Sequence, residues 1–157
     1  MENSTPFLTV LTAKPEQPQC KTITPDKVVE PARGYEFRWR EEEIDGFDAL
    51  ARVLDTLQSQ PCDVAVLGRV RDDARDQNEI LRRKYDRVKD GKTEPHTIED
   101  HGSRFLHLDL DDLPLPDGSD WRDPAALAAW TWEQVGARFK PLRGVSCWWQ
   151  ASGSAGT

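Results

Sequence analysis

Cysteine is scarce in this sequence, and its three copies, Cys20, Cys62 and Cys147, are far apart. No two of them form the Cys-x-x-Cys pair that is typical of zinc-binding knuckles, and an odd number does not suit a disulfide framework. The sequence therefore predicts neither a structural zinc site nor a small fold held together by disulfides.

Long apolar runs are also missing. No stretch approaches the roughly 20 apolar residues that a membrane-spanning helix requires. The first ten residues, MENSTPFLTV, lack the basic start and the apolar stretch of a secretory signal peptide. We therefore expect a protein of the reducing cytoplasm that makes no use of a membrane.

Charge is abundant but unevenly distributed. The net charge of −7 counts against a dedicated nucleic-acid-binding protein, because such proteins usually carry a basic surplus. Basic residues nevertheless exceed acidic ones between Arg69 and Lys92, whereas the region from Glu94 to Glu133 is strongly acidic. The distribution of charge is therefore more informative than its sum.

Strands and helices are expected to alternate along the chain. Alternating or β-branched apolar residues predict strands, and apolar residues at three- and four-residue steps predict helices. The predicted strands cover residues 7–12, 21–24, 35–40, 63–68, 105–114 and 145–150. The predicted helices cover residues 44–57, 76–88 and about 123–138, and residues 89–102 are expected to form a loop. This pattern predicts an α/β (α+β) domain in which helices flank a mixed sheet.

The stretch 105–114, FLHLDLDDLP, contains the strongest candidates for chemistry. Side chains two residues apart share one face of a strand, so His107, Asp109 and Asp111 would lie opposite a face of leucines. The two carboxylates would be about 6.6 Å apart along the backbone and would repel by roughly 2 kcal/mol at an effective dielectric constant of about 20. A divalent cation between them would relieve that repulsion, and hard oxygen ligands suit Mg²⁺ or Mn²⁺.

The same stretch is also compatible with an acidic strand end that runs into a turn, where aspartate is common. Asp112 is the best candidate for such a turn residue. A single histidine such as His107 more often forms a structural hydrogen bond than a metal bond. Spacing alone does not decide between a metal site and a polar strand end.

Three further features are candidates for contacts with phosphate. The small residues around Ser152 and Ser154 would let backbone N–H groups approach an anion, although a flexible chain end has the same composition. Arg69 follows the predicted strand 63–68 and could bind phosphate or remain solvated. The basic stretch after it could follow a nucleic-acid backbone, or form an exposed helix with internal ion pairs.

Three motifs, taken in their order along the chain, resemble those of the archaeo-eukaryotic primase superfamily. The resemblance is in particular to the primase–polymerases of phages and mobile elements. The first is the strand that ends in Leu67-Gly68-Arg69. The second is the sequence LHLDLD of residues 106–111, which matches a motif of alternating hydrophobic residues and aspartates. The third is the strand 145–150 that leads into the small residues 151–156. The resemblance implies that residues 1–157 form one domain. In it a strand and helix region (1–68) and a basic helix and loop (69–102) precede part of a catalytic core (103–157).

The resemblance also implies a reaction and a set of site residues. Asp109 and Asp111 would be the catalytic residues that bind Mg²⁺ or Mn²⁺, and Ser152, Ser154 and Arg69 would bind the nucleotide. Proteins of this kind transfer a nucleotide to a 3′-hydroxyl with the help of two divalent ions. The implied partners are a DNA template, nucleoside triphosphates and a replicative helicase.

The later motifs of that family, a Ser-x-His sequence and a further carboxylate, would lie after Thr157. His96, His101 and His107 come too early to replace that histidine. We therefore expect the N-terminal part of a longer catalytic region, inactive on its own. Two other functions remain open: a metal-dependent phosphohydrolase that uses Asp109 and Asp111, and a non-enzymatic protein of a mobile element. The latter would bind nucleic acid or a replication protein through its basic region.

Overall fold

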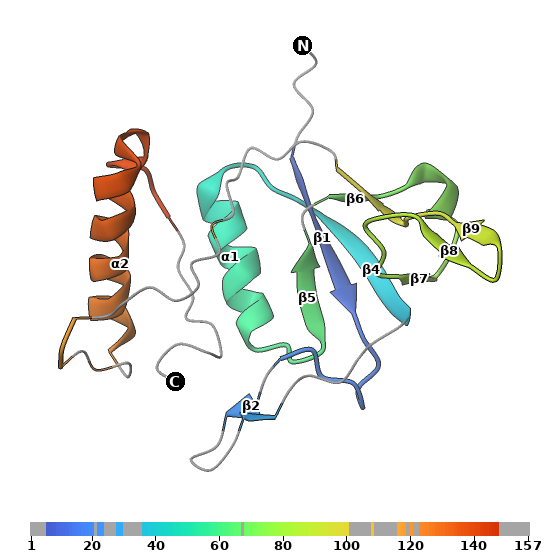
Figure 1. Ribbon diagram of the computed structural model, residues 1–157, viewed down its shortest axis with the longest axis horizontal. Helices are drawn as coiled ribbons and strands as arrows, with labels where there is room; N and C mark the ends of the chain where they lie inside the picture. The colour runs from blue at the N-terminus through green and yellow to red at the C-terminus, as the bar shows by residue number, and fades with distance from the viewer. Residues whose placement is uncertain are drawn as a thin grey trace. The chain divides into compact units, whose positions relative to one another are not determined.

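The computed structural model describes residues 6–20, 22–23, 28–29, 36–66, 68–100, 108, 116–118, 120 and 123–147. The chain divides into two compact units, Met1–Leu106 and His107–Thr157 (Figure 1). Helices and strands both contribute to it, which confirms the predicted α/β (α+β) class.

A four-stranded sheet forms the centre of the first unit. Its order is β5–β1–β4–β7, made of β5 (Asp63–Val66), β1 (Phe7–Thr12), β4 (Glu36–Glu43) and β7 (Glu79–Leu81). Every pair of neighbours in it is antiparallel. The β-branched and apolar sequence of β1, FLTVLT, suits a central strand, because such side chains pack well on a pleated surface.

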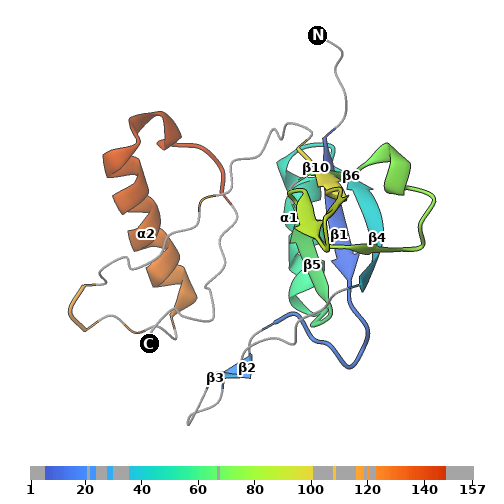
Figure 2. The ribbon, with the colours of Figure 1, turned by 45° about the vertical axis from the view of Figure 1, so that its right-hand side comes forward.

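Each face of this sheet carries its own hydrophobic cluster, because successive side chains of a strand point to opposite faces. On one face, Leu8 packs with Ile44 and with Leu50 of helix α1 (Phe47–Gln58). On the other face, the cluster is formed by Leu11, Ala13, Phe37, Val70, Ala74, Ile80 and Ile98. Figure 2 shows α1 alongside β5, whose Ala65 packs against the first of these clusters.

Short elements cover the second face. After β5 come β6 (Arg69–Val70) and the 3₁₀ turn η1 (Asp72–Ala74), and β10 (Ile98–Glu99) pairs with β6. Between β7 and β10, β8 (Arg87–Lys89) and β9 (Lys92–Glu94) form an antiparallel hairpin. A further short pair joins β2 (Thr22–Ile23) to β3 (Val28–Val29).

The second unit contains helix α2 (Pro124–Arg138) and the 3₁₀ turn η2 (Lys140–Leu142). The Oδ1 of Asp123 accepts a hydrogen bond from the backbone N–H of Ala126 at 3.0 Å. This is the N-cap that the Asp-Pro sequence predicts, since proline suits the first helical position. Leu127, Thr131 and Val135 are buried and recur every four residues, so they form one face of the helix.

Most of the predicted elements before residue 67 are confirmed, as is the helix that starts after Asp123. The basic helix predicted over residues 76–88 is wrong, and so is the loop predicted over residues 89–102. Those segments contain β7, β8, β9 and β10. Ile80 is buried by pairing with Phe37 of β4, which is a long-range contact that helical spacing does not reveal.

The two late predicted strands fall largely outside the described residues. Of residues 105–114 the structure describes Leu108 alone, and of residues 145–150 it describes 145–147, which are not in a strand. Within the described part of the chain, no helix combines the length and apolar content needed to cross a bilayer.

Gly68 occupies a position that other residues do not fit. Its φ of +123° lies in a region that favours glycine. A Cβ there would come within 2.5 Å of the carbonyl oxygen of Glu99 and 2.9 Å of the Ile98 Cγ2. The carbonyl of Gly68 also accepts a hydrogen bond, at 2.6 Å, from the hydroxyl of Thr9, which is fully buried. Gly68 therefore brings β6 and β10 close to β1.

Replacing Gly68 with alanine should lower the free energy of unfolding by about 2–4 kcal/mol, because backbone strain adds to the clash with β10. Urea unfolding measures this loss. Gly46→Ala is the matched control, since Gly46 has a φ of +89° but nothing within 4 Å of the added methyl. The control should lose about 1 kcal/mol. Equal losses in the two variants would contradict the close approach at Gly68.

Candidate functional site

Four of the five site residues predicted from the sequence, Asp109, Asp111, Ser152 and Ser154, lie outside the described residues. Their roles stay predictions. Among the residues that the structure does describe, no three His, Cys, Asp or Glu side chains gather as a metal site would require. The fifth residue, Arg69, lies in β6 immediately after Gly68.

Arg69 is held by the two inner strands of the central sheet, where β1 starts and β4 ends. Its guanidinium carbon lies 5.2 Å from the centre of the Phe7 ring, a distance at which a cation is attracted to an aromatic face. Its Nε lies 3.5 Å from the Oε1 of Glu41. The side chain keeps 26% of its surface exposed, so it is anchored yet still reaches solvent.

A second arginine contacts the same carboxylate. One terminal nitrogen of Arg75 lies 2.6 and 2.8 Å from the two carboxylate oxygens of Glu41, and the guanidinium carbon lies 5.7 Å from the centre of the Trp39 ring. We call Phe7, Trp39, Glu41, Arg69 and Arg75 the Glu41 cluster. Two guanidinium groups face the Glu41 carboxylate in it, and Asp72 adds a second carboxylate 3.2 Å from the Nε of Arg75.

The electrostatics of the cluster follow from its partial burial. Burial alone would raise the pKa of the Glu41 carboxyl. The hydrogen bond and charge of Arg75, together with the charge of Arg69, outweigh burial, so the pKa of Glu41 is lower than its ordinary value. The hydrogen bond to Glu41 in turn raises the pKa of Arg75. The Glu41 carboxylate and the Arg75 guanidinium are therefore both ionised at neutral pH.

The strand sequence contains a signal for Glu41 that the predicted boundaries missed. In EFRWREEE, the residues that share a face with Phe37 and Trp39 include Glu41. The predicted strand ended at residue 40, one residue before Glu41 and three residues before the end of β4. No comparable signal exists for Arg75, because it reaches Glu41 from η1, 34 residues away in the sequence.

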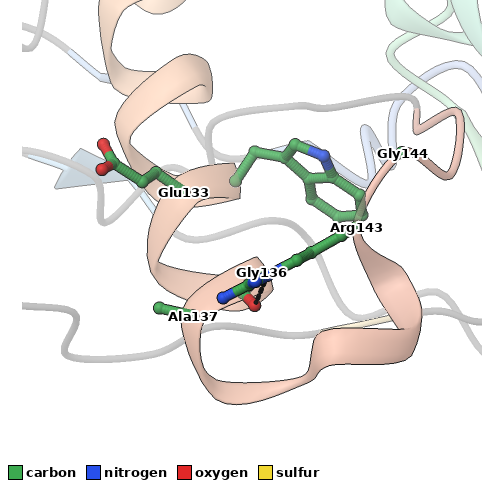
Figure 3. Close-up of a pocket in the computed structure, with 6 residues that line it drawn as sticks. Glu133, Gly136, Ala137, Arg143 and Gly144 are labelled. Atoms are coloured by element: carbon green, nitrogen blue, oxygen red, sulfur yellow. Dashed lines mark hydrogen bonds between the residues drawn. The ribbon is translucent and has the colours of Figure 1, made fainter.

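The second unit has a hollow of about 370 Å³ near the end of α2. It is lined by Trp132, Glu133, Gly136, Ala137, Arg143 and Gly144. The Nε of Arg143 donates a hydrogen bond to the carbonyl of Gly136 at 2.8 Å (Figure 3). It thereby partners a carbonyl in the last turn of α2, where the helix itself leaves acceptors unpaired. Figure 3 shows Glu133 pointing away from Arg143, so the polar groups do not converge as they do in a ligand site.

Comparison with known proteins adds no further assignment, because no family model, curated protein or solved structure matches this chain.

Replacing Glu41 with glutamine should lower the free energy of unfolding by about 1–3 kcal/mol at pH 7, because hydrogen bonds to charged groups are lost and two arginines remain close together. The pKa of Glu41 is lower in the folded state than its ordinary value of 4.5. The stabilisation is therefore complete above that value and is lost as the pH falls through the folded pKa. Urea unfolding at neutral and acidic pH should show the two proteins converging in stability at the acidic end.

Glu43→Gln is the control for this measurement. Glu43 lies on the same strand and is exposed, so the substitution should change stability by less than about 0.5 kcal/mol. A gap between the wild type and Glu41→Gln that persists at acidic pH would contradict the ionic origin of the stabilisation.

Proposed function

We propose that this chain carries the first metal-binding motif of a template-directed nucleotidyltransferase, similar to the primase–polymerases of phages and mobile elements. The observation that carries the proposal is the order of three motifs in one chain. The Gly68-Arg69 element comes first, the Asp109-x-Asp111 motif second, and the small residues around Ser152 and Ser154 last.

The described elements on either side of the aspartates support this proposal. β5 leads to Gly68, whose backbone conformation and close packing admit no side chain. Helix α2 starts at the predicted Asp123 cap after the aspartates. Arg69 is fixed by Phe7 and Glu41 but remains partly exposed, which suits a side chain that contacts a phosphate.

The donor set fits the proposed metal. Asp109 and Asp111 offer carboxylate oxygens, which are the ligands that Mg²⁺ and Mn²⁺ prefer. Bound divalent ions would neutralise the negative charge of a triphosphate and of its leaving group. The two aspartates would hold the ions, and Ser152, Ser154 and Arg69 would donate hydrogen bonds to the phosphates of the nucleotide. These roles amount to positioning and charge stabilisation.

The partners of this proposed activity are a DNA template, nucleoside triphosphates and a replicative helicase, and we place the activity in the cytoplasm. Cys20, Cys62 and Cys147 are all free thiols, which is in keeping with a reducing compartment.

Removing both carboxylates, in Asp109→Asn/Asp111→Asn, should weaken Mn²⁺ binding by the 157-residue chain at least about tenfold, or about 1.4 kcal/mol. Electron paramagnetic resonance of free Mn²⁺ during titration measures this. Asp112→Asn/Asp117→Asn removes the same charge nearby and should bind Mn²⁺ as the wild type does.

Equal Mn²⁺ binding by the wild type and both variants would overturn the proposed metal site. Trapping of a covalent phosphate on Asp109 would overturn the transferase and indicate a phosphohydrolase instead.

A further inference from the structure

A basic hairpin extends from the first unit, on the side away from α1 (Figure 1). We define the basic hairpin as residues 82–97, which contain β8, β9 and the chain that leads into and out of them. Six basic side chains and three acidic ones lie between residues 82 and 94. This surplus of positive charge contrasts with the net charge of −7 of the whole chain.

The base of the hairpin is firmly anchored. The backbone N–H groups of Thr97 and Ile98 both donate to the carbonyl of Arg83, at 2.9 and 3.0 Å. The guanidinium of Arg83 lies 2.7 Å from the Oε2 of Glu94. Asp86 accepts two hydrogen bonds from His96, one from its backbone N–H at 2.9 Å and one at its Nδ1 at 2.7 Å. These contacts hold the hairpin in place without using its outer cations.

Each of the three acidic residues has a structural role. Glu94 pairs with Arg83, and Asp86 pairs with His96. Asp90 and Gly91, with φ of 51° and 73°, form the two-residue turn between β8 and β9, and Asp-Gly is favoured in such turns because both positions need positive φ. Glu94 and Asp86 are therefore engaged at the base of the hairpin, and the exposed carboxylate of Asp90 faces a larger number of cations.

Five cations in the hairpin have no ion pair with any residue that the structure describes. They are Arg82, Lys84, Arg87, Lys89 and Lys92, all of them exposed. Arg87 lies directly opposite Glu94 in the register, but Glu94 is taken by Arg83. Lys89 lies directly opposite Lys92, an arrangement of like charges that destabilises a hairpin. Arg87, Lys89 and Lys92 thus share one face and repel one another.

The hairpin also exposes apolar side chains. Val88 is 73% exposed and lies on the other face, opposite Thr93. Tyr85, just before β8, is 75% exposed. An isolated two-stranded ribbon is at best marginally stable in water, and an exposed aromatic ring on it buries nothing. A ligand that offers both negative charge and flat apolar surfaces would suit both the exposed cations and the exposed ring of Tyr85.

We propose that the basic hairpin binds single-stranded nucleic acid, with Arg87, Lys89 and Lys92 contacting phosphates and Tyr85 stacking on a base. Single strands combine a charged backbone with exposed base faces, which aromatic side chains recognise. Duplexes stack their bases internally and present mainly phosphates and groove edges. The hairpin shares no residue with the proposed Asp109-x-Asp111 motif, so this inference and the proposed metal site can fail independently.

Replacing the three cations, in Arg87→Gln/Lys89→Gln/Lys92→Gln, should weaken binding of the 157-residue chain to a labelled oligothymidylate of about 16 nucleotides. Fluorescence anisotropy at about 50 and about 200 mM salt measures the affinity and its salt dependence. We expect at least a tenfold loss at the lower salt concentration, and a salt slope that is smaller by about 2, because each phosphate contact on a single strand contributes about 0.7.

The matched control is Arg38→Gln/Arg52→Gln/Lys140→Gln, which removes the same charge from exposed positions elsewhere. It should lose much less affinity than the hairpin variant. Far-UV circular dichroism checks that both variants remain folded.

Tyr85→Ala tests the stacking contact separately, with no change in charge. It should weaken binding about fivefold or more while leaving the salt slope unchanged, and Tyr85→Phe should restore the affinity, because the ring provides the stacking. These two variants also test the proposal if the triple variant does not fold.

The inference is overturned if the wild type does not bind the oligothymidylate at about 50 mM salt. It is also overturned if the hairpin variant and the control lose affinity equally. A duplex of the same length that binds as tightly, with no effect of Tyr85→Ala, would show a general attraction for polyanions and overturn the single-strand assignment.

Discussion

Strand β1 is buried on both of its faces, and the architecture of the first unit follows from that constraint. Leu8 and Val10 lie on one face and Thr9 and Leu11 on the other, each at most 3% exposed. Two layers are therefore needed to cover it, and α1 supplies only one. The other comes from short elements after β5, held close by the hydrogen bond from the Thr9 hydroxyl to the Gly68 carbonyl. A buried hydroxyl needs such a partner, so the conformation of Gly68 and the burial of β1 depend on each other.

The Glu41 cluster joins the short elements that cover the second face of the sheet to the end of β4. β4 starts on this face with Phe37 and Trp39, and it ends in glutamates that could not be buried without partners. Arg69 lies in β6 and Arg75 directly follows η1, so their contacts with Glu41 hold both short elements against the sheet. The same contacts place Arg69 at a fixed position while leaving it partly exposed. The contacts that pack β6 against the sheet are thus the same ones that position Arg69, the candidate for binding phosphate.

The elements that were predicted correctly are those whose signals are local. The apolar spacing before residue 58 and the Asp-Pro start of α2 are short-range patterns, and the structure follows both. The helix predicted over residues 76–88 failed because Ile80 is fixed by pairing with Phe37, far away in the sequence. The Asp90-Gly91 dipeptide was a hairpin signal that the predicted loop overlooked. Asp109 and Asp111, which carry the resemblance to primase–polymerases, lie outside the described residues and remain predictions from motif order.

An acidic protein can still present a basic surface, because charges in solution act over a short range. At physiological ionic strength exposed charges are largely screened beyond about 8 Å, so a ligand at the basic hairpin responds chiefly to the side chains around it. Within that range Glu94 is already paired with Arg83 and Asp86 is hydrogen-bonded to His96, and the six basic side chains between residues 82 and 94 still outnumber the three acidic ones. The repulsion between Lys89 and Lys92, which lie opposite each other, destabilises the free protein and is relieved when an anion binds between them. Repulsion that a ligand relieves contributes directly to its affinity, which is why the unpaired cations, rather than the net charge, identify this surface.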